Sequence, residues 1–206
     1  MKLRLVSVEE RGESEMLELI PELRFAEGKK RACYRHPKRD EVCVKVDLQP
    51  SSLSQKEAMV EVKAHRRVLK REQSSAILSG FLGIEETNIG TGYLFELIRN
   101  EDGSLCSTLR ACREELSDSM IKSLVRDFFH TCLENDYVVG DLHPKNVLVQ
   151  DQRRLVIVDG LGAVDLLPLY YSSRLLRRLK LNRKIRRLCR LLEIAYDEGN
   201  PFWISK

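Results

Sequence analysis

The sequence predicts an α+β fold in two parts. Short β-type runs and one long helical segment fill the first half, whereas the second half is mostly helical around a single predicted β-hairpin. The polar, glycine-bearing stretch "NEDGS", residues 100–104, lies near the middle of the 206-residue chain. We therefore expect a β-rich part over residues 1–99 and a helical part over residues 100–206.

The composition is that of a globular protein that stays in the cytoplasm. Hydrophobic residues make up 43% of the chain, which is enough for a packed core. No apolar run reaches the roughly 18 residues that a membrane-spanning helix needs, and the N-terminus turns acidic before a signal peptide could form. None of the six cysteines forms a C-x-x-C pair, so we expect reduced thiols.

In the first part, the run "VCVKVDL" alternates, with Val42, Val44 and Val46 on one side and Cys43, Lys45 and Asp47 on the other. We expect this run and the short run "ACY" to be neighbouring strands, joined by the turn segment "HPKRDE". The run "SLSQKEAMVEVKAHRRVLKRE", residues 52–72, predicts a helix, with Ser54 and Glu57 as a capping box. Two strands joined by a turn with Gly and Asn follow within residues 80–98.

The second part opens with a predicted helix over residues 117–136, whose apolar residues recur at helical period. Two short strands follow, "VLVQ" (147–150) and "LVIV" (155–158), joined by "DQRR". Phe202 and Trp203, near the end of the chain, are expected to pack or to form an interface.

The C-terminal helix is strongly basic. Residues 174–190 carry nine Arg or Lys and no acid, whereas the whole chain has a net charge of only +4, so the surplus is local. The sequence predicts an apolar stripe of Leu175, Leu179, Ile185, Leu188 and Leu192. The basic face is either simply solvated or binds an acidic protein partner, an anionic membrane or nucleic acid. Nucleic acid is the least expected of these, because the helix has few aromatic residues for base stacking.

Three polar residues at the predicted hairpin point to chemistry. Asn146 precedes the first strand and Asp159 follows the second, so a tight hairpin places them at the same end, with Asp141 five residues upstream. An amide oxygen beside a carboxylate suits Mg²⁺, and a second carboxylate could accept a proton from a hydroxyl. The alternative is that Asp141 and Asn146 only cap a loop and that Asp159 only ends a strand.

The quoted segments resemble known phosphotransferases. "GDLHPKN" followed by "VDGLG" is similar to the catalytic loop and the metal-binding segment of the protein-kinase-like superfamily, and "VCVKV" resembles its third-strand lysine element. More closely, "GKKRACYRHP", "CVKV", "GTGYLFELI", "HPKNVLV" and "VDGLG" followed by "LLPL" are similar to the YrbL family of the bacterial PhoP regulatory network.

This resemblance implies a protein-kinase-like two-lobed fold that uses ATP and Mg²⁺. The β-rich lobe would hold one long helix, and the second lobe would be short and mainly helical. Lys45 would bind the α- and β-phosphates, with Glu61 as its helix partner rather than Glu57, which the capping box already explains. Asp141 would accept the proton of a substrate hydroxyl, and Asn146 and Asp159 would hold Mg²⁺.

Other positions follow from the same resemblance. Gly28 would belong to the loop over the phosphates, and backbone groups of residues 96–98, from Glu96 to Ile98, would meet the adenine edge. His143 and Lys145 could touch phosphate, although a solvated loop face is an equal alternative. For Lys45 the alternative is a surface lysine on a half-exposed strand.

Three departures from the superfamily pattern leave catalysis open. Gly28 stands alone where G-x-G-x-x-G is usual, with Lys29, Lys30 and Arg31 as possible substitutes, and Val139 replaces the usual histidine. Only 47 residues follow Asp159, which is short for a platform that binds a peptide. A nucleotide-binding pseudokinase, or a regulatory adaptor without phosphotransfer, is the alternative to a phosphotransferase.

Overall fold

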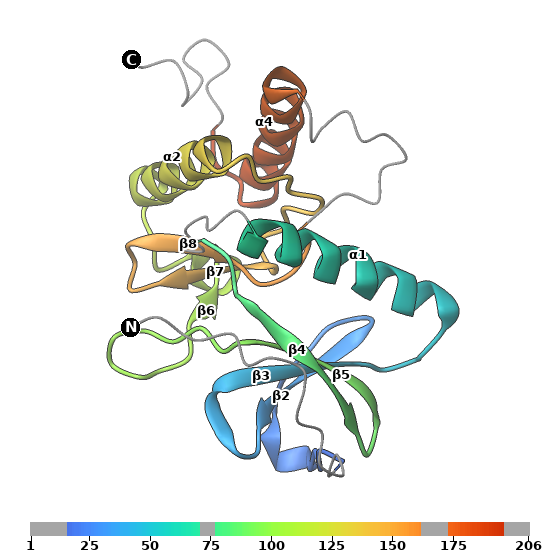
Figure 1. Ribbon diagram of the computed structural model, residues 1–206. Helices are drawn as coiled ribbons and strands as arrows, with labels where there is room; N and C mark the ends of the chain where they lie inside the picture. Colours follow the sequence, from blue (N-terminus) through green and yellow to red (C-terminus); the bar gives the residue numbers. More distant parts are fainter. Residues whose placement is uncertain (1–15, 71–76, 162–172, 196–206) are drawn as a thin grey trace.

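The computed structural model describes residues 16–70, 77–161 and 173–195 and has the predicted α+β fold (Figure 1). The segment "LLPL" (166–169) and the residues Phe202 and Trp203 lie outside these ranges. The helices of the described residues are η1 (Pro21–Leu23), α1 (Ser52–Lys70), η2 (Ala111–Arg113), α2 (Asp118–Glu134) and α4 (Arg174–Leu191), where η is a 3-10 helix. The strands are β1 (Arg24–Glu27), β2 (Arg31–His36), β3 (Arg39–Asp47), β4 (Phe81–Thr87), β5 (Gly90–Glu96), β6 (Ser107–Thr108), β7 (Val147–Gln150) and β8 (Arg154–Ile157).

The larger sheet has five antiparallel strands in the order β1-β2-β3-β5-β4. Strand β3 lies at its centre and is buried on both faces from Val42 to Asp47. The alternation in the sequence did not decide between a buried and a half-exposed face for Lys45. Val44 and Val46 pack with residues of the N-terminal segment and β2, whereas Cys43 packs with α1 and β5. Lys45 therefore extends toward the face of the sheet that the helix covers.

Helix α1 begins at Ser52, as predicted, but other residues than expected cap it. The Ser51 hydroxyl accepts from the Ser54 amide (3.1 Å), and the Ser54 hydroxyl accepts from the Ser51 amide (3.0 Å), so a reciprocal pair of serines caps the helix. The predicted box of Ser54 and Glu57 is wrong, because Glu57 instead bonds to Lys30 at 2.6 Å. The helix reaches from the large sheet to the core of the second part, where Ala64 is buried.

The smaller sheet, in the order β6-β7-β8, packs with α2 and α4. Figure 1 shows both helices on the side of this sheet away from the five-stranded sheet. Helix α2 buries the predicted stripe, and the Ser117 hydroxyl caps it by accepting from the Met120 amide. The β7–β8 hairpin is confirmed, with Val147 opposite Ile157.

The two sheets are joined by backbone hydrogen bonds just before β4. The Ile157 amide donates to the Ile77 carbonyl (2.8 Å), and the Ser79 amide donates to the Ile157 carbonyl (3.0 Å). The segment that enters the large sheet therefore runs parallel to the end of β8. This junction places the residues after β8 next to the face of β3 that carries Lys45.

Helix α4 corrects the predicted apolar stripe. Ile185, Leu188 and Leu192 are buried as expected, but Leu175 and Leu179 are 65% and 56% exposed. The first half of the helix instead buries Arg177 and Lys180. Arg177 forms an ion pair with Asp136, just beyond the end of α2, which allows a guanidinium to face the protein interior. None of the helices over residues 16–70, 77–161 and 173–195 is long and apolar enough to cross a membrane.

Candidate functional site

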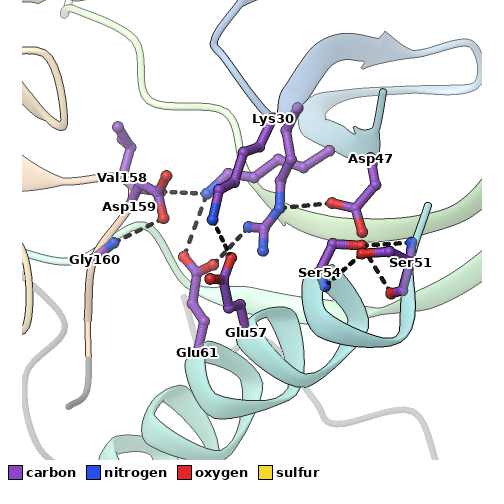
Figure 2. Close-up of polar contacts among 11 residues, drawn as sticks. Lys30, Asp47, Ser51, Ser54, Glu57, Glu61, Val158, Asp159 and Gly160 are labelled. Atoms are coloured by element: carbon purple, nitrogen blue, oxygen red, sulfur yellow. Dashed lines mark hydrogen bonds and ion pairs between the residues drawn. The ribbon is translucent and has the colours of Figure 1, made fainter. Parts of the chain in front are cut away.

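Lys45 is the centre of a buried polar cluster and not a surface lysine. Figure 2 shows Glu61 and Val158, two of its partners. Its side chain is 6% exposed. The ammonium lies 3.5 Å from a carboxylate oxygen of Glu61 on α1 and donates to the carbonyl of Val158, just after β8. It also lies 4.0 Å from the centre of the Phe95 ring. A carboxylate, a carbonyl and an aromatic face thus compensate for burying this charge.

Glu61 holds two cations at once. One carboxylate oxygen faces Lys45, and the other accepts from the Arg31 guanidinium at 2.8 Å. Arg31, on β2, also bonds to Asp47 at 3.0 Å, which lies opposite it in the β2–β3 register. Of the two glutamates considered from the sequence, Glu61 is the one that contacts Lys45, while Glu57 bonds to Lys30 near the surface, as Figure 2 shows.

The electrostatics keep Lys45 charged. Burial alone would lower the pKa of the Lys45 ammonium, but the carboxylates of Glu61 and Asp159 outweigh burial and raise it. The same two carboxylates, with Asp47, raise the pKa of Arg31 against the opposing effect of burial. Asp159 therefore lies within electrostatic reach of both cations.

The polar loop before β7 is held against the segment after β8. The amides of Gly140 and Asp141 both donate to the Gly160 carbonyl, at 2.8 and 3.1 Å. Gly160 has a φ of +87°, and a Cβ atom built on it would lie 2.5 Å from the Asp141 carbonyl oxygen. Only glycine fits this close approach in this backbone conformation. The loop and the strand end are thereby locked together at one point.

This lock gathers the three predicted polar residues. The Asn146 side-chain amide donates to the Asp141 carboxylate at 3.2 Å, and the Asn146 carbonyl accepts from the Val158 amide at 3.0 Å. Asp159 follows directly, with one carboxylate oxygen accepting from the Gly160 amide at 2.8 Å. Asp141, Asn146 and Asp159 therefore share one end of the β7–β8 hairpin.

The donor set at this end suits Mg²⁺. With its amide nitrogen turned to Asp141, Asn146 keeps its side-chain oxygen for another partner, and Asp159 keeps a second carboxylate oxygen. Mg²⁺ is usually bound by one or two protein oxygens together with water and substrate phosphates. Within the described part of the chain, no group of three or more His, Cys, Asp or Glu could hold a metal on its own. The predicted metal ligands thus fit an ion shared with a phosphate.

Other predicted site residues are already used in protein contacts. The Gly28 amide donates to the Arg31 carbonyl (2.8 Å) at the turn between β1 and β2. The Glu96 carbonyl accepts from the Ser79 hydroxyl (2.9 Å), and the Ile98 carbonyl accepts from the Cys106 amide. A carbonyl oxygen has a second lone pair, so the adenine contacts of Glu96 and Ile98 stay predictions.

His143 and Lys145 build the loop itself. The Lys145 amide donates to the Nδ1 atom of His143 at 3.2 Å, and the Asn146 amide donates to the His143 carbonyl at 2.8 Å. These bonds shape the turn that presents Asn146, which accounts for a histidine at this position. Contact of either side chain with a phosphate stays a prediction.

Three residues make contacts at this site that the sequence did not predict. Arg31 was considered only as a possible phosphate ligand, yet it bridges Glu61 and Asp47; its place opposite Asp47 follows from the β2–β3 register. Phe95 lies under the Lys45 ammonium and has no polar signature. Arg187 of α4 lies 3.7 Å from Asp141, a contact between segments too far apart in sequence to be predicted.

Comparison with known proteins adds the family. A family model described as "PhoP regulatory network protein YrbL" matches residues 17–193, which is most of the chain. The chain belongs to the YrbL family. Proteins named "Uncharacterized protein YrbL" from Escherichia coli (strain K12) and Shigella flexneri are each 26% identical to it over 167 residues, covering 77% of this chain and 80% of theirs. The range that the family model matches contains Lys45, Glu61, Asp141, Asn146 and Asp159.

Proposed function

We propose that this YrbL-family chain is a protein-kinase-like phosphotransferase that transfers the γ-phosphoryl group of ATP to a hydroxyl. The observation that carries the proposal is the position of Lys45. Its ammonium is paired with Glu61 and contacts the carbonyl immediately before Asp159, so a cation for phosphate and a carboxylate for metal lie together. Such a reaction relies on positioning and charge stabilisation more than on covalent chemistry of the protein.

The arrangement of the elements also supports a two-lobed kinase-like fold. The five-stranded antiparallel sheet carries its lysine on the central β3, and α1, which follows β3, supplies the paired glutamate. The polar loop and the Asp159 segment then flank the β7–β8 hairpin of the second part. This order of lysine, glutamate, loop aspartate, asparagine and metal-binding aspartate matches the order of roles in protein kinases.

In the proposed reaction, each residue has one role. Lys45 binds the α- and β-phosphates, while Glu61 and Arg31 hold it in place. Asn146 and Asp159 bind Mg²⁺, which neutralises charge that develops on the phosphates. Asp141 accepts the proton of the acceptor hydroxyl. The hydroxyl oxygen bonds to the γ-phosphorus while the bond from the γ-phosphorus to the bridging oxygen of the β-phosphate breaks, which leaves ADP.

The proposal is tested by phosphate transfer from γ-labelled ATP with Mg²⁺, to the chain itself or to a panel of hydroxyl compounds. Asp141→Asn keeps the size of the side chain but removes the proton acceptor. We expect transfer in the wild type and a loss of about 10²-fold or more in the variant, on the order of general-base catalysis. Equal transfer by both proteins would contradict the assignment of Asp141.

A second candidate is a nucleotide-binding pseudokinase that regulates a partner, with or without a link to the PhoP network that gives the family its description. The contact of Arg187 with Asp141 favours it, because the guanidinium lies against the carboxylate that a phosphotransferase would use to accept the proton of the acceptor hydroxyl. This candidate predicts nucleotide binding without phosphate transfer. Both candidates place the chain where ATP is available, in the cytoplasm.

A further inference from the structure

The face of α4 next to the polar loop is lined with cations. Arg187 reaches Asp141 directly, at 3.7 Å, and both side chains are about half exposed. Lys184, one turn earlier, is acted on electrostatically by Asp141, Lys180, Arg187 and Arg183. Positions 184 and 187 are three residues apart and so share a face. The helix thus presents two cations, Lys184 and Arg187, to the loop that holds Asp141.

Lys184 and Arg187 are like charges one turn apart, and the carboxylate of Asp141 acts on both. Burial is the main cause that lowers the pKa of the Lys184 ammonium, and the neighbouring cations lower it further. Like charges one turn apart destabilise a helix. An anion bound at this face would remove that repulsion.

We propose that the acceptor substrate carries a phosphate group close to its reactive hydroxyl, and that Lys184 and Arg187 bind this phosphate. The inference rests on the proposed function and names the class of acceptor. Arg187 offers a planar fork that suits phosphate oxygens, and Lys184 adds a compact charge one turn away. Once the phosphate engages Arg187, Asp141 is released from its ion pair and faces the acceptor hydroxyl.

The competing explanation is that Arg187 only neutralises Asp141 and fixes the loop. In that case neutral and phosphorylated acceptors would bind alike, and removing the cations would affect both. Binding of matched pairs of compounds separates the two explanations. Glycerol 3-phosphate with glycerol, and glucose 6-phosphate with glucose, differ only in the phosphate and serve as probes.

The experiment is calorimetric titration of the full chain with each compound, at two salt concentrations. We expect binding of at least one phosphorylated probe, weaker binding at higher salt, and no comparable binding of its neutral partner. Lys184→Gln and Arg187→Gln should each weaken it about tenfold, by loss of a charge-assisted contact. Arg174→Gln is the matched control, because Arg174 is exposed at the start of the same helix, roughly 20 Å away.

The outcomes keep this inference separate from the proposed function. If neither phosphorylated probe binds, or if Arg174→Gln weakens binding as much as Arg187→Gln, the phosphate site is wrong, whatever the nucleotide result. If the phosphorylated probe binds through Lys184 and Arg187 but Mg²⁺-ATP does not bind, the anion site stands and the phosphotransferase proposal fails.

Discussion

The ammonium of Lys45 donates to the backbone carbonyl of Val158, 113 positions further along the chain. This contact ties the central strand of the five-stranded sheet to the end of the β7–β8 hairpin. It puts the buried cluster of Lys45, Arg31 and Glu61 where the two parts of the molecule meet. The predictions below follow from this junction.

Glu61→Gln should destabilise the fold strongly. The change leaves Lys45 and Arg31 buried without their shared carboxylate, and breaking a buried ion pair costs roughly 3–5 kcal/mol. Glu57→Gln is the matched control, because it breaks only the partly exposed pair with Lys30, which is worth about 0–1 kcal/mol. Urea unfolding of both variants measures the difference. Equal losses would show that the Glu61 network does not stabilise the junction.

Gly160→Ala should separate the polar loop from the strand end. A Cβ atom there would lie 2.5 Å from the Asp141 carbonyl oxygen, so the loop must shift. Gly103→Ala is the control, because Gly103 has nearly the same positive φ (+84°), but a Cβ atom added to it would meet no other atom within 4 Å.

Both alanine variants share the backbone strain, of about 1–3 kcal/mol. The collision adds to it only in Gly160→Ala, which should therefore unfold at lower urea concentration and bind Mg²⁺-ATP more weakly than Gly103→Ala. Identical behaviour would mean that the contact between Gly160 and Asp141 is not needed.

Stability should fall in acid because of His65. Burial, with a smaller contribution from Lys45, lowers the pKa of His65 from 6.5 to about 4. Since the folded-state pKa is depressed, the unfolded chain binds a proton below pH 6.5 that the folded chain does not, until about pH 4. The free energy of unfolding should drop by up to roughly 3 kcal/mol across this window.

Substitution His65→Gln removes this titration. Urea unfolding at intervals from about pH 7 to about pH 4 should show a shallower acid slope for the variant than for the wild type. The edge-on packing of His65 against Phe95, with ring centroids 5.3 Å apart, is lost as well, so the variant starts from a lower stability at neutral pH. Parallel slopes would contradict a neutral, buried His65.

Lys45 makes the stability of the fold depend on pH in the opposite direction, with a loss in alkali. Its pKa is raised in the folded state, so its contribution is fully present below the unfolded value near 10.5 and is lost as the pH rises through the folded value. We expect the wild type to lose stability above about pH 10.5. Lys45→Met should show less of this alkaline loss in the same unfolding experiment.

Much of this junction could be predicted from periodicity. The alternation of β3 placed Val42, Val44 and Val46 on one face, and the apolar stripe of α2 indicated the core of the second part. The burial of Lys45 on the other face was implied by the resemblance and not by the alternation. Glu61 was chosen over Glu57 because Glu57 was assigned to a helix cap. The choice of Glu61 matches the contact, but the reason was wrong, since Ser51 and Ser54 form the cap.

What periodicity missed has physical causes. All four residues of strand β1 are exposed, so no buried face marks it in the sequence, and β6 has only two residues. In α4, the pattern of leucines predicted a buried apolar stripe, but in the first two turns Leu175 and Leu179 are exposed and Arg177 is buried. The ion pair of Arg177 with Asp136 compensates for burying the guanidinium. Such a pairing depends on a partner 41 residues away that no local pattern reveals.

The most direct test of the central claim is the melting shift that Mg²⁺-ATP produces. At about a tenfold excess of nucleotide over its dissociation constant, we expect the wild type to melt about 3–6 °C higher. Asp159→Ala should lose the shift, whereas Asp127→Ala, at an exposed position on α2, should keep it. A wild-type chain that melts at the same temperature with and without Mg²⁺-ATP, or an Asp159→Ala variant that keeps the full shift, would contradict the account.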